Sequence, residues 1–293
     1  TVSGSWLVII GATFTAANSL VQFTATSTGE TITTGGSAFY NLIFNGSTGD
    51  CGAGHTDNGD GTCTAKLQGA GTENLADTML YQGEGDTNYG SDIYFFVRGL
   101  TTYNHRGILK FELSSIPNNS TINSAALYLY QRGTAYTGTH NIGAHFVSDD
   151  SWVESTTTWN NQPSHNGTAM DTIDVDNTGG AAWYNWNITD QTQTEYGDNQ
   201  KISIKMVSQL EGGGTNRQRS FHTKEYTTDE SLRPYLNATY TVSSGGWTFA
   251  ANDHDVNNNF TITAGSVTST SGTLYVGGNW SNLATFNHGG GTV

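Results

Sequence analysis

The sequence lacks long apolar runs, is poor in basic residues and contains almost no proline. No apolar stretch approaches the roughly 20 residues that a membrane-spanning helix requires, so we expect no membrane span. Only 11 Lys and Arg stand against 25 Asp and Glu, and the formal net charge of −14 argues against a nucleic-acid partner. With 3 Pro and 37 Gly among 293 residues, short strands joined by tight glycine turns are favoured.

The residues that are present predict a folded all-β chain. Charged residues make up only 12% of the sequence, about half of the usual fraction. Apolar residues reach 35%, and 7 Trp, 14 Tyr and 12 Phe are enough to build hydrophobic cores. Signals for helices are nearly absent, and the length predicts about two domains.

The distribution of positive charge indicates where the domains begin and end. Every Lys and Arg lies between Lys66 and Arg233, and none lies in either flank. We therefore predict an N-terminal β-repeat at 1–50, a linker with a disulfide loop at 51–74, a central β-sandwich at 75–242 and a C-terminal β-repeat at 243–293.

Both flanks are expected to form short strands with one buried face. Phe260 and Ile262 alternate with Thr261 and Thr263, which is the period of two that strands show. A β-solenoid and a small sandwich both satisfy this pattern. The flanks also share a cassette in which Trp, Ala-Thr-Phe and Val follow in order. Its residues are Trp6, Phe14 and Val21 in the first copy, and Trp280, Phe286 and Val293 in the last.

The related flanks predict assembly of identical subunits head to tail. The stretch that follows Val21 has no counterpart after Val293, so the last copy is open to pairing with an incoming strand. Such a contact is heterologous and would build an open filament. The residues assigned to this contact are Trp6, Leu7, Ile9, Phe14, Trp280, Phe286 and Val293.

The centre carries longer strands that need a facing sheet. Leu127 and Leu129 share one face of a predicted strand, and Tyr128 and Tyr130 share the other. Residues 106–113 and 201–206 alternate in the same way. A β-sandwich is the natural packing for such strands.

Five ordered motifs in the centre resemble the DNRLRE family, which is related to the disaggregatase domain and to alginate-binding modules. They are DTNYG at 86–90, HRGILKFELSSIP at 105–117, INSAALYLY at 122–130, SWVESTTTWNNQPS at 151–164, and SFHTKE at 220–225 leading to RPYLNATY at 233–240. The resemblance covers roughly residues 75–242 and implies a jelly-roll-like β-sandwich with a carbohydrate-linked history. The flanks separately resemble the GGNW-type repeats of long secreted surface proteins.

Two sets of residues are candidates for carbohydrate binding. The first is an aromatic and polar loop: Trp152, Glu154, Thr158, Trp159 and Asn160. Aromatic faces stack on pyranose rings, but a structural role at a loop corner is the favoured interpretation of these residues. The second is basic and could bind uronate carboxylates, the alternative being a solvated face. Its members are Arg106, Lys110, Lys201, Lys205, Arg217 and Arg219.

The only two cysteines enclose a glycine-rich loop, and we expect a disulfide between Cys51 and Cys63, which would place the protein in an oxidising compartment outside the cell or on its surface. Inside the loop, Asp57, Asn58 and Asp60 offer hard oxygens at the positions that calcium loops use. The downstream Glu of an EF-hand is missing, and an ordinary Asx turn is the alternative.

A second acidic cluster consists of Asp77 and Asp86 with Asn88, next to Glu84. It precedes the first strand of the sandwich, where modules resembling this one can hold a structural calcium. Calcium is the only cofactor expected.

No pattern in the sequence points to catalysis. The eight His are scattered, and neither a metalloprotease motif, a nucleophile elbow nor a Walker loop is present. Asp149, Asp150 and Glu154 could in principle form a glycosidase pair. Three hypotheses follow: a structural subunit of an extracellular filament or surface array, a module that binds an acidic cell-surface polysaccharide, and a hydrolase or lyase that resembles disaggregatase.

Overall fold

The chain forms two compact units. The structure is a computed structural model that describes residues 1–9, 12–25, 29–45, 51–69, 75–118, 120–133, 138–213, 216–242 and 245–293. Residues 1–51 and 241–293 build one unit with the short stretch 119–121, and residues 52–118 and 122–240 build the other. The predicted boundaries at 50, 74 and 243 lie outside the described residues. In the described part of the chain, no helix is long and apolar enough to cross a membrane.

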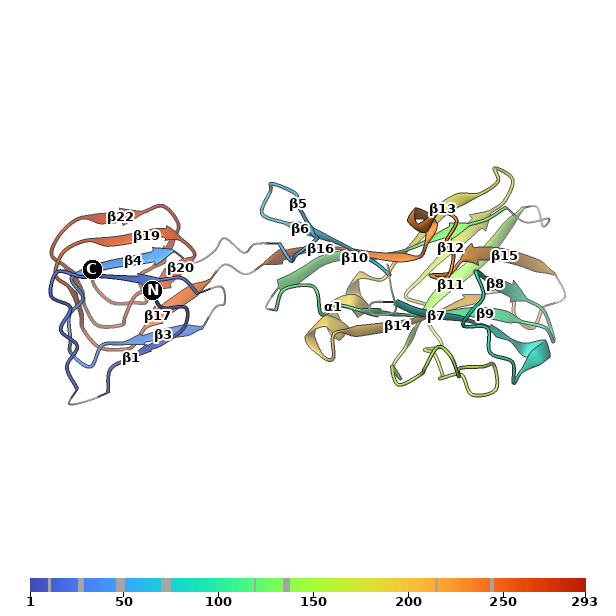
Figure 1. Cartoon of the computed structure of the whole chain (residues 1–293), viewed down its shortest axis with the longest axis horizontal. Coiled ribbons are helices and arrows are strands. Elements are labelled where there is room, and N and C mark those ends of the chain that lie inside the picture. The colour runs from blue at the N-terminus through green and yellow to red at the C-terminus, as the bar shows by residue number, and fades with distance from the viewer. Residues whose placement is uncertain are drawn as a thin grey trace. The chain divides into compact units, whose positions relative to one another are not determined.

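The two flanks of the sequence fold together into a single unit of parallel strands. Three sheets have the orders β1-β3-β17-β20-β23, β2-β4-β19-β22 and β18-β21. Figure 1 shows blue strands of the N-terminal flank beside red strands of the C-terminal flank. The strands are β1 (Trp6–Leu7), β2 (Leu20–Phe23), β3 (Glu30–Thr33), β4 (Asn41–Asn45), β17 (Gly246–Phe249), β18 (His254–Val256), β19 (Phe260–Ala264), β20 (Ser266–Thr268), β21 (Leu274–Val276), β22 (Trp280–Asn282) and β23 (Thr285–Asn287).

The register identifies this unit as a parallel β-solenoid. Trp247 pairs with Val267, His254 with Leu274, and Phe260 with Trp280, so equivalent residues recur about every twenty positions. Parallel strands stacked at a constant interval cannot form a small antiparallel sandwich. Of the two architectures that the sequence left open for the flanks, the solenoid is therefore correct.

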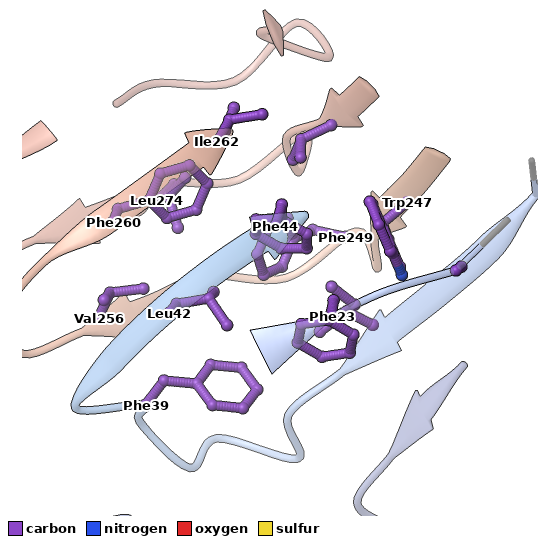
Figure 2. Packing of buried hydrophobic residues seen from close by; sticks show 13 residues of the cluster. Phe23, Phe39, Leu42, Phe44, Trp247, Phe249, Val256, Phe260, Ile262 and Leu274 are labelled. Carbon is purple, nitrogen blue, oxygen red and sulfur yellow. The ribbon is translucent and has the colours of Figure 1, made fainter. Parts of the chain in front are cut away.

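Aromatic side chains fill the interior of the solenoid. Phe23 and Phe44, on neighbouring coils, stack with ring centroids 5.2 Å apart, and Phe44 contacts Phe260 at 5.5 Å. Trp247 is 1% exposed and lies 5.1 Å from Phe44. Figure 2 shows that these rings come from both flanks and point into one core. The rings pack in edge-to-face and stacked contacts, and such close packing is typical of a well-ordered protein interior.

The cassette shared by the two flanks does not mark equivalent positions. Trp6 lies on β1 and pairs with Ile32 in one sheet, whereas Trp280 lies on β22 and pairs with Phe260 in another. The true equivalents of Trp280 are Phe260, Leu42 and Val21, which pair in succession along one sheet. The expected equivalence is wrong because turn and aromatic residues recur at every corner of a solenoid.

The central unit is inserted at one corner of the solenoid. Between β19 and β20 the chain turns through a single residue, Gly265, with φ of 88°. Between β4 and β17, one coil earlier, residues 46–245 occupy that place. Gly245 accepts a hydrogen bond from the N–H of Ser266, just as Gly265 accepts one from Thr285. Gly245 is therefore the corner residue of its coil, and the insertion precedes it.

This equivalence predicts that the solenoid folds without the insertion. A variant that joins Asn45 directly to Gly245 should show a single cooperative thermal transition and a Trp247 shielded from acrylamide quenching. Glycine can adopt the positive φ that the corner needs, so no strain opposes the junction. A matched variant that joins Asn45 to Phe249 lacks the corner and most of β17, and it should melt without cooperativity. Equal behaviour of both variants would contradict the assigned corner.

The central unit is a sandwich of antiparallel strands. Its strand order is β12-β11-β14-β9-β8-β15-β10-β16-β6-β5, with β7 on β9 and β13 on β10. The strands are β5 (Thr56–Asp57), β6 (Cys63–Gln68), β7 (Leu75–Tyr81), β8 (Tyr94–Gly99), β9 (His105–Glu112), β10 (Ser120–Gln131), β11 (Thr139–Val147), β12 (Asp171–Asp176), β13 (Ala182–Asn187), β14 (Lys201–Ser208), β15 (Arg217–His222) and β16 (Tyr235–Val242). Three short helices join them: η1 (Gln82–Glu84), α1 (Thr189–Gly197) and η2 (Glu230–Leu232). The all-β sandwich expected from the sequence is confirmed.

The alternation on β10 decides which side chains face the core and which face outward. Leu127 and Leu129 are fully buried, whereas Tyr128 and Tyr130 remain partly exposed. Trp186 on β13 crosses the interior, where its indole N–H donates to the carbonyl of Ile142 at 2.9 Å. This hydrogen bond satisfies the one polar group of a fully buried side chain.

The predicted disulfide is present, because both Cys51 and Cys63 are disulfide-bonded. The segment assigned to a linker also supplies β5 and β6, a hairpin at the end of the central sheet. The hydroxyl of Tyr240 accepts from the N–H of Gly52 and bonds His55 Nδ1 at 2.6 Å. The loop is thereby fixed to β16 by side-chain hydrogen bonds as well as by pairing.

Candidate functional site

The basic residues predicted to form a ligand groove are largely engaged inside the sandwich. Lys205 and Arg219 are fully buried. Arg219 donates to the main-chain carbonyls of Val175, Gln218 and Gly138, and Lys205 Nζ donates to Gln162 Oε1 at 2.9 Å. Neither side chain can reach a polysaccharide in this conformation. Their expected role in ligand binding is corrected to one of holding loops on the sheet.

The remaining members of the basic set have partners of their own. Arg106 forms a bidentate ion pair with Glu211, with Nη2 2.6 Å from Oε2. Lys201 Nζ lies 3.3 Å from Glu112 Oε1, and an N–H of Arg217 donates to the carbonyl of Thr139. Lys110 Nζ donates to the carbonyls of Asp150 and Trp152. The shared strand faces were predicted correctly, but side chains and carbonyls of the same domain already satisfy these cations.

The loop that contains Trp152 and Trp159 covers Arg106, Lys110 and Lys205. Trp152 is 6% exposed, donates from its indole N–H to Ser203 Oγ at 2.9 Å, and packs on Ile108. The guanidinium of Arg106 lies over the ring of Trp159, 4.6 Å from the centroid. Both indoles are therefore used in packing, and Trp152 offers no free face to a sugar. The period-two pattern of β9 and β14 cannot reveal that a loop covers one face.

The burial of Lys205 predicts a pH dependence of stability. Burial, with a contribution from Arg106, lowers the pKa of Lys205 from 10.5 to about 7 in the folded state. Between pH 7 and about 10 the unfolded chain binds the proton that the folded chain has released, so the free energy of unfolding rises with pH. One proton contributes at most about 1.4 kcal/mol per pH unit. Urea unfolding of Lys205→Met across this range should show a flatter slope than the parent protein. An unchanged slope would rule out Lys205 as its source.

The outward faces of five strands, and the loop that follows β15, carry a continuous band of aromatic rings. We call this set the aromatic band: Tyr94, Tyr128, Tyr130, Trp183, His222, Tyr226 and Tyr235. Tyr128 and Tyr235 stack in parallel with centroids 4.6 Å apart, and Trp183 contacts Tyr235 edge to face at 5.1 Å. His222 connects this part to Tyr226 and Tyr94. All members except His222 are partly exposed.

Register explains why these rings meet. Tyr130 on β10 pairs directly with Trp183 on β13, and their rings lie 5.3 Å apart. Tyr235 stands at the start of β16, which neighbours β10 in the sheet. Aromatic pairs across strands stabilise a sheet and also leave a rigid apolar surface outward. Among these residues, the alternation of β10 revealed Tyr128 and Tyr130, whereas no local signal set Trp183 apart.

Two cations lie on rings of the aromatic band. Lys66 Nζ is 4.4 Å from the ring centroid of Tyr235, and the guanidinium carbon of Arg132 is 3.8 Å from that of Tyr94. The described residues give neither cation an ion pair. Burial and the nearby Arg132 lower the pKa of His222 to about 4, so its ring is neutral at pH 7. The band thus combines apolar rings, phenol hydroxyls and two positive charges.

The second acidic cluster differs from the one expected. Asp77 comes together with Glu154 and Glu225, and one carboxylate oxygen of each lies within 4.8 Å of the others. Asp86 instead accepts from Asn160, and the amide of Asn88 donates to the carbonyls of Glu154 and Thr157, both at 2.7 Å. Glu84 accepts a hydrogen bond from the hydroxyl of Tyr89. Asp86 and Asn88 hold two loops together. Glu154 and Glu225 lie far from Asp77 in the sequence, so the sequence analysis did not group them with it.

The chemistry of this cluster is that of crowded, buried carboxylates. Burial, followed by the charge of Glu225, raises the pKa of Asp77 well above its ordinary value. Burial also raises the pKa of Glu154, against the opposing effect of Lys224. Lys224 Nζ lies 2.8 Å from Glu154 Oε1 and also contacts Glu225. Among the described residues this is the one group of three acidic or metal-binding side chains close enough to share an ion.

The first calcium candidate forms the tip of the β5–β6 hairpin. Asp57 Oδ1 accepts from the N–H of Gly59, and Asp60 Oδ1 accepts from the N–H and hydroxyl of Thr62. Asn58 donates to the hydroxyl of Thr62 at 2.8 Å. These are the hydrogen bonds of Asx turns, and they engage the oxygens that an ion would need. The geometry matches the alternative that the sequence analysis left open.

The central unit is an all-β sandwich, and comparison with known families indicates its ligand class. Residues 70–240 match the family model of carbohydrate-binding module family 96. Because the match covers more than half of the chain, the protein belongs to this family. A search of curated proteins found no match. The resemblance seen in the sequence is therefore confirmed at the level of a carbohydrate-binding β-sandwich domain.

Proposed function

We propose that the central domain binds an acidic polysaccharide outside the cell, and that the aromatic band is its binding surface. Family membership supports carbohydrate as the ligand class. The observation that carries the choice of surface is the unbroken series of ring contacts from Tyr226 through Tyr130 and Trp183 to Tyr128. Sugars present apolar C–H faces that pack on aromatic surfaces, and hydroxyls that bond polar groups at their rim.

Polar groups around the band support recognition of a charged sugar. Lys66 and Arg132 would meet uronate or sulfate groups along a bound chain, and the amide of Asn185 stands opposite Tyr128 in the register. The chain as a whole carries a net charge of −14, so long-range attraction of a polyanion is not available. Local contacts at these two cations must then provide selectivity. The disulfide supports an oxidising, extracellular setting.

The aromatic band predicts which substitutions abolish binding. Trp183→Ala and Tyr235→Ala should each weaken binding of a soluble polyuronate by roughly five- to thirtyfold, because a stacked ring contributes about 1 to 2 kcal/mol. Isothermal titration with the full chain gives the affinities. Tyr103→Ala is the matched control, since Tyr103 is 53% exposed and belongs to no ring pair of the band. Equal loss in all three variants, or in none, would place the site elsewhere.

A separate arm tests the acidic ligand class. Lys66→Ala should weaken polyuronate binding and reduce its dependence on salt, while a neutral β-glucan should bind poorly to every variant. If the neutral glucan binds as tightly as the polyuronate and Trp183→Ala abolishes both, the band is the site but the ligand is not acidic. If neither polymer binds the intact chain, the proposed function fails as a whole.

The solenoid favours a second candidate function, namely a unit of a longer array. β1 and β2 end two sheets on one side, and β22 and β23 end them on the other, so both ends of the stack have edge strands. The exposed side chains there include several that the sequence analysis assigned to assembly. Leu7 is 70%, Ile9 66% and Val293 55% exposed, and Trp280 is 39% exposed. Trp6, Phe14 and Phe286 instead pack against the solenoid core.

Assembly through these edges has a direct test. Sedimentation velocity of the intact chain should show particles that lengthen as concentration rises, because a parallel coil added at one end recreates the same edge. Leu7→Lys places a charge on β1 and should suppress elongation. Ile93→Lys, an exposed position in the central unit, should leave it unchanged. A monomer at every concentration would refute head-to-tail assembly.

A further inference from the structure

The buried acidic cluster lies where three separate parts of the central domain meet. Asp77 belongs to β7, Glu154 to the loop between β11 and β12, and Glu225 to the segment that follows β15. A hollow of about 380 Å³ reaches this point, and Gly90 and Ser155 are among the residues that line it. Glu154 and Glu225 line the hollow and are partly exposed, whereas Asp77 is buried behind them, so a small solute can reach the cluster.

The described residues leave the negative charge of this cluster only partly compensated. Three carboxylates share one ammonium group, that of Lys224. The side chain of Asp77 is 1% exposed, and its Oδ2 accepts from the N–H of Lys224 at 2.9 Å. Its Oδ1 has no hydrogen-bond partner among the described residues, and neither has Glu225 Oε2. Buried carboxylate oxygens without partners are costly, so native proteins supply a cation or a donor.

The donor set restricts which cation fits. All the available ligands are oxygens, and the group contains neither Cys nor His. Carboxylate oxygens favour hard cations such as calcium and magnesium over zinc or copper. Calcium accepts six to eight oxygens in irregular arrangements, whereas magnesium demands an octahedron and retains water. Three carboxylates from a strand and two loops form an irregular set of oxygens, which suits calcium better.

We propose that Asp77, Glu154 and Glu225 bind a divalent cation of the calcium type. Without the ion, Lys224 alone compensates the negative charge of the carboxylates. When the ion binds, it compensates this charge instead, and Lys224 moves toward the opening of the hollow. The site differs from the glycine-rich hairpin of Asp57 and Asp60, whose oxygens already accept hydrogen bonds within the turn.

Bound calcium would lock the covering loop onto the sandwich. Glu154 belongs to the same loop as Trp152 and Trp159, which shield Ile108 and Arg106. A cation that joins this loop to β7 and to Glu225 adds a further link to the hydrogen bonds and the ion pair of Glu154 with Lys224 that hold the loop. Calcium is then expected to raise the free energy of unfolding by RT ln(1 + c/Kd), where c is the concentration of free calcium, and this free energy continues to increase at concentrations above Kd.

The test uses the full chain after treatment with a chelator. Titration with calcium chloride should show one binding site and an increase in melting temperature, and magnesium chloride at equal concentration should give a smaller increase. Glu225→Gln preserves shape and removes one charge, and it should weaken calcium binding at least tenfold. Asp60→Asn removes a charge from the hairpin instead and should bind calcium like the parent.

Each alternative outcome is distinct. Absence of any calcium response in a folded parent protein would overturn the proposal. So would a response that Asp60→Asn abolishes and Glu225→Gln retains, because the ion would then occupy the hairpin. If Glu225→Gln does not fold, Asp77→Asn provides a second isosteric change with the same expected loss. Calcium binding that Glu225→Gln and Asp77→Asn both retain at the affinity of the parent would show that the cluster holds no ion.

Discussion

The whole architecture depends on the pairing of β3 with β17 and of β4 with β19. These ladders join residues that are separated by the entire central unit, such as Phe44 and Ile262. Closing a long loop costs little more than closing a short one, because the entropy grows only with the logarithm of its length. A folded insertion with suitably placed ends reduces even that cost. The aromatic core formed by Phe23, Phe44 and Trp247 exists only once this pairing has formed.

The sequence predicted burial correctly for strands with one face in the core and the other face in solvent. The alternation of Phe260 with Thr261 and of Leu127 with Tyr128 predicts which residues are buried, and the structure agrees. It failed where a third element intervenes. Lys110 and Lys205 lie on the predicted face, but the loop around Trp152 covers them. Periodicity describes a strand and contains no information on what packs over it.

The candidate sites show the same limit. Trp183 joins Tyr130 because β13 pairs with β10, and Glu154 joins Glu225 because a loop folds back over the sheet. Both juxtapositions are properties of topology, and a single sequence does not contain them. The predicted disulfide needed no topology, since only two cysteines exist and one short loop separates them. The sequence thus predicted a contact between residues that are close along the chain, but not contacts between residues that only the fold brings together.

The insertion at a solenoid corner has a mechanical consequence. Covalently, the central unit stands in series between Asn45 and Gly246, so without the ladders a pull on the two ends of the chain would stretch it. The parallel strand pairs β3–β17 and β4–β19 connect the residues before the central unit directly to the residues after it through backbone hydrogen bonds. While these ladders hold, they carry the load from one coil to the next, and no tension reaches the central unit. A ligand-binding domain placed in this way can keep its fold, and therefore its affinity, while the scaffold around it is under tension.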